Sequence, residues 1–233
     1  MKIVILCGGL GSRLSEETKK KPKPMVKIGK DPILLHIMRI YLKYGFKSFV
    51  LALGYKKNNI IKYFKKNRLK DVEIQFIDTG KNSLTANRLL KLRNILKKEE
   101  NFFLTYGDGL SNVNINKLLK LHLSKKKVAT VTAVRPPARF GELKIGNSGL
   151  VKKFEEKNQV NEGWINGGFF IFNKKIFDYL PKSQCMLERE PMNKLVSDNQ
   201  LISYKHHGFW QCMDTLRDKE LLNKAWKQKK NKW

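Results

Sequence analysis

Three parts of the sequence combine residue types that suit phosphate binding and a divalent cation. The first is a glycine-rich loop, residues 8–13, which follows an apolar run and ends in Arg13. Glycines let backbone N–H groups approach phosphate oxygens, and an arginine adds a planar fork of donors. The spacing fits neither the P-loop nor the dinucleotide fingerprint, because Leu14 stands where a third glycine is required. A tight strand-to-helix turn is the plain alternative for the loop taken alone.

The second part is a lysine between two prolines, in the segment Pro22, Lys23 and Pro24. Proline fixes its own φ and restricts the residue before it, so we expect an extended, stiff segment that holds Lys23 in place. A fixed cation beside a phosphate-binding loop can stabilise the charge of a phosphoryl-transfer transition state. Taken alone, Lys23 would be read as one solvated loop lysine among many.

The third part is a pair of aspartates far apart in the chain. Asp108 lies between two glycines at the end of a strand candidate, and the carboxyl ends of strands line the ligand crevice in open α/β sheets. Asp214 precedes the last helical segment and doubles as a candidate N-cap. Two carboxylates, completed by waters and substrate phosphates, are the usual ligands of Mg²⁺. A turn residue and a helix cap are the plain alternatives for these two positions.

Apolar β-branched runs alternate with amphipathic helical segments along residues 1–135, a pattern typical of a mainly parallel sheet covered on both faces. The expected strands are residues 2–6, 49–53, 73–77, 102–105 and 129–134. The expected helices are residues 33–44, 58–64, 87–96 and 115–123. The glycine-rich loop and Asp108 each follow one of these strands, so we expect them at the same edge of the sheet.

After Pro136 and Pro137 the elements become shorter. The expected strands are residues 143–145, 150–154 and 165–172, and the expected helices are residues 174–179, 190–196 and 215–226. We therefore predict a single α/β domain over residues 1–233. Residues 1–135 would form its nucleotide-binding half and residues 136–233 its acceptor-binding half, with one sheet shared by both.

The chain is strongly basic, with 48 Lys and Arg against 20 Asp and Glu and a net charge of +28. Such a field attracts polyanions, so a nucleic-acid-binding protein is an alternative of another class. The excess is mostly lysine, spread from Lys19 to Lys232, whereas a nucleic-acid module gathers arginines and aromatic residues on one face. We favour a solvated basic surface and no nucleic-acid partner.

Composition also bears on the compartment. No run approaches the roughly 20 apolar residues that cross a bilayer, and the apolar residues 3–7 are too few for a signal peptide. Three cysteines without a paired CxxC spacing, Cys7, Cys185 and Cys212, fit a reducing environment and are interpreted as buried filler. We expect a cytoplasmic protein without a membrane partner. The four scattered histidines are interpreted as surface or packing residues.

In their order along the chain, these parts resemble the sugar-1-phosphate nucleotidyltransferase family, and within it the branch that uses CTP. The stretches that carry the resemblance are residues 5–18, 21–26, 32–34, 36–38, 53–56, 78–80, 105–109, 139–141, 164–170, 208–211 and 213–219. They cover nearly the whole length. Residues 15–18 and 213–219 favour the cytidylyltransferase branch over the uridylyl, thymidylyl and guanylyl relatives.

The resemblance implies a Rossmann-like, GT-A-like fold and transfer of CMP from CTP to a small phosphorylated acceptor, with Mg²⁺ as cofactor and pyrophosphate as by-product. The first expectation for the acceptor is α-D-glucose 1-phosphate. The alternative is another sugar phosphate, or a phosphorylated non-sugar such as a small amino-acid derivative, used to modify a surface polysaccharide. A homo-oligomer is compatible with the resemblance, and intact candidate catalytic residues argue against an inactive regulatory relative.

The resemblance also implies roles for individual positions. Arg13, Lys23 and Asp108 are the expected catalytic residues, and Asp108 and Asp214 the expected metal ligands. The residues expected to bind the nucleotide are Leu6, Gly8, Gly9, Gly11, Ser12, Arg13, Lys23, Thr85, Tyr106 and Gly107. Those expected to bind the acceptor are Arg139, Gly141, Glu156, Lys157, Asn166 and Gly167, with Lys157 on its phosphate group.

The chain departs from the branch in three places. A stretch that the branch has between Phe64 and Val72 is absent. Where the branch has two glycines before an arginine, this chain has Ala86 and Asn87, whose side chains we expect to narrow or reshape the base pocket because only glycine leaves room for close backbone approach. Asn158 replaces a proline after Lys157. Glu188 and its neighbours could shape the acceptor pocket or simply begin a helix.

Overall fold

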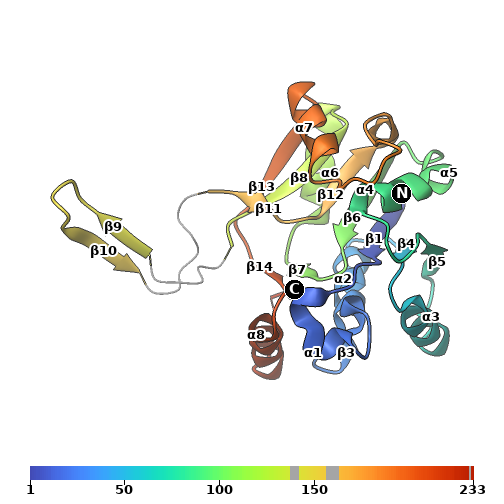
Figure 1. The fold of residues 1–233 in the computed structure, drawn as a ribbon, viewed down its shortest axis with the longest axis horizontal. Helices are drawn as coiled ribbons and strands as arrows, with labels where there is room; N and C mark the ends of the chain where they lie inside the picture. The colour runs from blue at the N-terminus through green and yellow to red at the C-terminus, as the bar shows by residue number, and fades with distance from the viewer. Residues whose placement is uncertain (137–141, 156–162, 231) are drawn as a thin grey trace.

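The protein is built around one mixed, mainly parallel sheet. The computed structural model describes residues 1–136, 142–155, 163–230 and 232–233 (Figure 1). The eight strands of the sheet are β1 (Ile3–Cys7), β4 (Ser48–Leu53), β5 (Glu73–Asp78), β6 (Asn101–Tyr106), β8 (Ala129–Val134), β11 (Ile165–Asn166), β12 (Phe170–Asn173) and β13 (Leu201–His206). Strand β1 lies at the centre, parallel to β4 and β6, and β5 continues beyond β4. Among these eight strands, only β11 and β12 are antiparallel to the strands that they pair with, and β13 is parallel to β8.

Three small antiparallel pairs lie outside this sheet: β2–β3 (Lys27–Ile28 and Asp31–Pro32), β7–β14 (Gly109–Ser111 and Trp210–Cys212) and β9–β10 (Glu142–Ile145 and Val151–Glu155). The β9–β10 hairpin stands apart from the main body in Figure 1. The β7–β14 pair joins the chain just after β6 to the chain just before the last helix. It therefore connects two segments that carry candidate site residues.

Helices cover both faces of the sheet. They are α1 (Ser15–Thr18), α2 (Ile33–Leu42), α3 (Lys57–Lys66), α4 (Thr85–Lys91), α5 (Arg93–Leu96), α6 (Ile115–Lys125), α7 (Glu190–Ser197) and α8 (Leu216–Lys227), with short 3-10 turns η1 (Ser12–Leu14), η2 (Lys23–Met25) and η3 (Lys174–Asp178). The central strand shows why both faces need cover: Ile3 and Ile5 join the core packed by α2, α3 and α6, while Val4 and Leu6 join the core packed by α4 and α5. Alternate residues of a strand face opposite sides, so a strand apolar on both faces requires two helical layers.

The carboxyl ends of β1, β4 and β6 approach one another closely. Each strand is followed at once by a glycine, namely Gly8, Gly54 and Gly107. A Cβ atom on Gly107 would lie 2.9 Å from the carbonyl oxygen of Leu6, and one on Gly54 would lie 2.7 Å from that of Gly8. Larger residues at these two positions would push the strand ends apart, so the glycines allow the three ends to form one edge.

The expected strands and helices of residues 1–135 are present, with ends shifted by one or two residues in most cases. The helix expected at residues 87–96 begins earlier and is broken into α4 and α5 at Leu92, whose side chain is fully buried. The expected extended conformation at Lys23 is wrong. Lys23–Met25 forms a 3-10 turn, which tolerates Pro24 because the first N–H groups of a helix have no partner within it.

The second half of the chain contains more differences. The single strand expected at residues 165–172 is wrong, because Gly168 (φ 73°) and Phe169 (φ 45°) are left-handed and separate β11 from β12. The helix expected at residues 174–179 is the 3-10 turn η3. Strand β13 was missed. The N-cap of the last helix is Thr215, not Asp214: the Thr215 hydroxyl and the Asp218 carboxylate form a reciprocal capping box.

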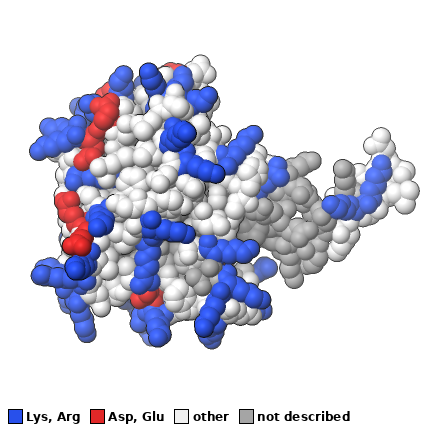
Figure 2. Space-filling model, turned by 180° about the vertical axis from the view of Figure 1, so that it is seen from behind, with Lys and Arg blue, Asp and Glu red and all other residues white. Residues whose placement is uncertain are grey.

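Basic side chains are spread over the face that Figure 2 shows rather than gathered in one patch. Lysines and arginines are scattered across the described part of this face, with only a few acidic groups among them. This distribution matches the expectation of a solvated basic surface; the absence of a nucleic-acid partner stays a prediction. No helix in the described part of the chain is both long enough and apolar enough to cross a bilayer.

Helix α6 offers a test of the local structure away from the site. The side chain of its N-cap residue Asn114 accepts a hydrogen bond of 2.9 Å from the backbone N–H of Lys117. We expect Asn114→Ala to lower the free energy of unfolding by about 1 kcal/mol, because one helix N–H loses its partner. Asn114→Asp, which keeps an acceptor, should cost much less. Urea denaturation measures both, and equal stability of the two variants would contradict the assigned cap.

Candidate active site

A cavity of about 340 Å³ opens at the edge where β1 and β6 end. Its volume is in the range of small-molecule sites, roughly 300–1,000 Å³. All the residues expected to bind the nucleotide line it: Leu6, Gly8, Gly9, Gly11, Ser12, Arg13, Lys23, Thr85, Tyr106 and Gly107. The lining is completed by Cys7, Pro24, Ser83, Leu84, Arg88, Asp108 and Met186. The structure thus brings the expected set into one cavity, and its role in nucleotide binding stays a prediction.

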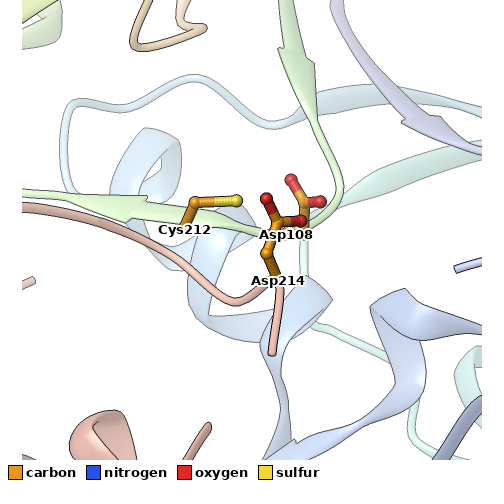
Figure 3. Close-up of side chains that lie close together, drawn as sticks. All are labelled: Asp108, Cys212 and Asp214. Carbon is orange, nitrogen blue, oxygen red and sulfur yellow. The ribbon is translucent and has the colours of Figure 1, made fainter. Parts of the chain in front are cut away.

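The two candidate metal ligands meet although they are far apart in the chain. Pairing of β7 with β14 sets Cys212 opposite Gly109, and the backbone N–H of Met213 donates to the carbonyl of Asp108 at 2.9 Å. Figure 3 shows Asp108, Cys212 and Asp214 gathered together. One potential ligand atom from each lies within 4.8 Å of the others. The small antiparallel pair is therefore the element that assembles the acidic centre.

Two cations lie against these carboxylates. Lys23 Nζ is 2.7 Å from Asp108 Oδ2 and 2.5 Å from Asp214 Oδ1, so one ammonium group bridges both acids. Arg13 contacts the other oxygen of Asp214 at 2.6 Å. The Lys23 side chain is 10% exposed and that of Arg13 is 71% exposed. Lys23 is therefore a buried cation held by both carboxylates, whereas Arg13 is a largely exposed cation at the edge of the cavity.

The pKa values of these groups follow from the contacts. Burial by itself lowers the pKa of Lys23, but the carboxylates of Asp108 and Asp214 outweigh burial and raise it above its ordinary value. Burial raises the pKa of Asp214, and the hydrogen bond and charge of Lys23, with the charge of Arg13, bring the net pKa below its ordinary value. Both groups therefore carry their charges at neutral pH.

The donor set fits a hard divalent cation. Asp108 and Asp214 supply carboxylate oxygens, which Mg²⁺ prefers. Burial, followed by the nearby charges of Asp108 and Asp214, raises the pKa of the Cys212 thiol, and sulfur is a ligand that softer metals prefer. The residues that would hold Mg²⁺ are accordingly the two aspartates.

Arg88 holds the glycine-rich loop in place through hydrogen bonds. Its buried guanidinium donates to the carbonyl of Gly8 at 2.8 Å, to Thr79 Oγ1 at 2.7 Å and to the carbonyl of Gly80 at 2.8 Å. These acceptors follow β1 and β5, so one side chain ties together the loops after two strands. The glycine-rich loop is thereby held by hydrogen bonds as well as by its close packing.

Ala86 and Asn87 were expected to narrow or reshape the base pocket, and their side chains do not narrow this cavity. Neither residue lines the cavity. Asn87 turns away from it: its amide donates to the carbonyl of Ser183 and accepts from the backbone N–H of Cys185, both at 2.8 Å. These residues therefore attach the segment before α7 to the start of α4.

The acceptor-side residues are described only in part. Arg139, Gly141, Glu156 and Lys157 lie outside the described residues. Asn166 donates to the Tyr106 hydroxyl at 3.2 Å. The carbonyl of Gly167 accepts from the indole N–H of Trp210 at 2.8 Å, which links β11 to β14.

Sequence reasoning gave too little weight to two residues. Glu188, which the sequence offers only as an option, accepts hydrogen bonds from the hydroxyls of Tyr106 and Thr85. Cys212 was interpreted as buried filler but lies beside the carboxylates. A weak signal was present, because Cys212 lies only two positions before Asp214, although β14 ends at Cys212. Three histidines, His36, His122 and His206, are buried packing residues, as expected.

Residues 2–220 match the nucleotidyl transferase family, and the chain belongs to that family. It is 42% identical, over an alignment 254 positions long, to the glucose-1-phosphate cytidylyltransferase of Salmonella typhimurium strain LT2, with 100% of this chain and 98% of that protein covered. It is 32% identical to the mannose-1-phosphate guanylyltransferase catalytic subunit beta of Dictyostelium discoideum, with 96% of this chain and 63% of that protein covered. The predicted membership of the sugar-1-phosphate nucleotidyltransferases, close to the cytidylyltransferase, is confirmed.

A solved structure, HddC from Yersinia pseudotuberculosis complexed with GMP-PN, superimposes with a TM-score of 0.76. The alignment covers 97% of this chain and 99% of that chain, at 24% identity. The likeness concerns the fold. It confirms the predicted α/β class with a mainly parallel central sheet flanked by helices.

Proposed function

We propose that this nucleotidyltransferase transfers CMP from CTP to α-D-glucose 1-phosphate, giving CDP-glucose and pyrophosphate. The observation that carries the proposal is the cavity in which the glycine-rich loop, Lys23 and Arg13 lie beside Asp108 and Asp214. The choice of CTP and glucose 1-phosphate is supported by 42% identity over the full chain to an enzyme of that name. We include Mg²⁺ as cofactor, since Asp108 and Asp214 suit it.

The chain's residues account for the reaction mainly by positioning and charge. An oxygen of the acceptor phosphate attacks the α-phosphorus of CTP and forms a new P–O bond. The bond between the α-phosphorus and the oxygen that bridges to the β-phosphate breaks, and its electron pair leaves with pyrophosphate. A phosphate monoester has a second pKa of about 6, so the attacking group is already ionised and no general base is required. The glycine loop and Arg13 orient the triphosphate, and Lys23 stabilises the charge near the α-phosphate. Bound Mg²⁺ supplies further neutralisation of that charge.

The proposed organisation is one domain of two halves. Strands β11, β12 and β13, from residues 136–233, complete the sheet begun by residues 1–135, which supports this division of labour. We assign the acceptor to Asn166 and Gly167 together with Arg139, Gly141, Glu156 and Lys157. The partners are CTP and a sugar phosphate, in a cytoplasmic enzyme without a nucleic-acid partner; assembly into a homo-oligomer stays open to measurement.

A substrate panel tests this function. Pyrophosphate release is measured with each of the four ribonucleoside triphosphates against a set of phosphorylated acceptors, including sugar 1-phosphates and phosphorylated amino-acid derivatives. We expect the highest kcat/KM for CTP with glucose 1-phosphate, and loss of turnover when divalent ions are chelated. If another acceptor gives a higher kcat/KM, that acceptor takes the place of glucose 1-phosphate in the proposal, and the transfer of CMP from CTP stands. If none of the acceptors gives pyrophosphate release with any of the triphosphates, the proposal is contradicted.

A further inference from the structure

His206 is a buried histidine at the end of β13, and the proposed reaction does not use it. Its Nε2 lies 3.2 Å from the carbonyl oxygen of Phe209 and 3.2 Å from Ser111 Oγ. A carbonyl oxygen only accepts hydrogen bonds, so Nε2 carries the proton and donates. Burial is the main influence on the pKa of His206 and lowers it, so at pH 7 the ring is neutral and has a single N–H.

The acceptors of this N–H belong to the two strands that assemble the acidic centre. Ser111 is the last residue of β7, and Phe209 comes directly before β14. Ser111 Oγ donates to the carbonyl of Phe209 at 2.8 Å and accepts from the backbone N–H of Val113 at 3.1 Å. One histidine of the main sheet is thus hydrogen-bonded to the ends of both short strands.

The β7–β14 pair is too short to keep its geometry unaided. It contains three residues in each strand, and a two-stranded hairpin on its own is only marginally stable in water. Asp108 comes directly before β7 and Asp214 lies two residues after β14, so a tilt of the pair would change the separation of the two carboxylates. His206 is itself held in the main sheet by pairing with Val134 of β8, and it can therefore anchor the pair.

The turn between β13 and β14 encloses the histidine ring. A Cβ atom on Gly208 would lie 2.7 Å from His206 Cε1 and 2.4 Å from Asn112 Oδ1, so this turn has no room for a side chain at that position. The backbone N–H of Asn112 also donates to the carbonyl of Phe209, at 3.1 Å. The place where β14 begins is therefore fixed by the ring and by the turn together.

We propose that His206 is a positioning residue for metal binding: by holding the β7–β14 pair against the main sheet, it keeps Asp108 and Asp214 at the separation that one divalent cation requires. The inference rests on the metal site of the proposed function. His206 does not line the cavity, so it acts through the strand pair rather than on a substrate. Groups that orient metal ligands in this way commonly change metal affinity when they are removed.

The test measures binding of Mn²⁺ alone, by calorimetric titration without nucleotide. His206→Leu removes the N–H donor and should weaken Mn²⁺ binding by about 5- to 10-fold, the change that corresponds to one lost hydrogen bond. His206→Gln, whose amide can donate from the place of Nε2, should stay within about 2-fold of wild type. The comparison is also made in the Lys23→Ala background, because Lys23 contacts both carboxylates and competes with the cation.

His122→Leu is the matched control. His122 is also a buried histidine, and its ring nitrogens lie 2.8 Å from Thr130 Oγ1 and 3.0 Å from Asn101 Oδ1, at the start of β6 rather than at its carboxyl end. This variant should lower the melting temperature about as much as His206→Leu and keep Mn²⁺ affinity within about 2-fold of wild type. Equal Mn²⁺ affinity in the two leucine variants, or no recovery in His206→Gln, would overturn the proposal.

Should His206→Leu fail to fold, Ser111→Ala decides the question, since it removes the hydroxyl that joins the ring to β7. It should weaken Mn²⁺ binding by a similar factor, and unchanged affinity would count against the anchor. No Mn²⁺ binding in either background would remove the metal site and this inference with it. The proposed function fails separately, because pyrophosphate release with CTP can be absent while the variants still differ in Mn²⁺ affinity.

Discussion

Asp108→Asn is expected to lower kcat by 10²-fold or more while the protein stays folded. Asparagine has the same shape but lacks the charge, so the site loses one of the two carboxylates proposed to hold Mg²⁺, an interaction needed in the transition state. Folding should survive because Lys23 keeps its 2.5 Å contact with Asp214. Steady-state pyrophosphate release measures the rate, and thermal unfolding measures the stability.

Asp178→Asn serves as its control, because that carboxylate is 71% exposed and its ion pair with Arg93 is 3.9 Å long. It should change neither rate nor stability appreciably. If Asp108→Asn keeps more than about a tenth of the wild-type kcat, the loss is far below that of a transition-state contact, and Asp108 is not a metal ligand.

Lys23→Ala should have the second large effect, because it should lower kcat and separately change the affinity for a divalent metal ion. Turnover should fall by about 10²-fold or more, because a cation fixed in the floor of the cavity is absent when charge develops on the phosphates. KM for CTP should change less than kcat. A rise in KM with unchanged kcat would make Lys23 a contributor to ground-state binding only.

In contrast to turnover, which Lys23→Ala should lower, the affinity of the protein for a divalent metal ion alone should rise in this variant. Lys23 Nζ lies within 2.7 Å of both candidate ligands, so in the protein without nucleotide it competes with a divalent cation for them. Removing it should tighten Mn²⁺ binding in the absence of CTP, by about 10-fold for a change near 1.4 kcal/mol. Calorimetric titration measures this affinity. Lys21→Ala is the matched control, since the neighbouring lysine pairs with Glu17 instead; equal Mn²⁺ affinity in both variants would contradict the competition.

The sequence predicts the site better than it predicts the element that assembles it. The glycine-rich loop and Asp108 follow strands whose nearly continuous apolar runs are plain in the sequence, and parallel strands place their carboxyl ends at one edge. Asp214 is different. Its position depends on the three-residue pair β7–β14, which has no periodicity long enough to be recognised.

Other differences arise where tertiary contacts override local preference. The prolines around Lys23 indicate a stiff segment, and the segment does hold the lysine, but through a 3-10 turn and two carboxylates rather than an extended chain. Ala86 and Asn87 were compared with glycines and so interpreted as narrowing a pocket. Their actual role depends on the partners of Asn87 at residues 183 and 185, nearly a hundred positions away, which no local pattern reveals.

The central place of β1 bears on how the protein is made. This strand is synthesised before both of its neighbours, which are formed by residues 49–53 and 103–106. Until the second of these emerges, the nascent chain carries an apolar strand with at least one open edge, which invites association with other chains. Pairing between segments so distant is also slow. We therefore expect production of the enzyme in cells to benefit from chaperone protection during this interval.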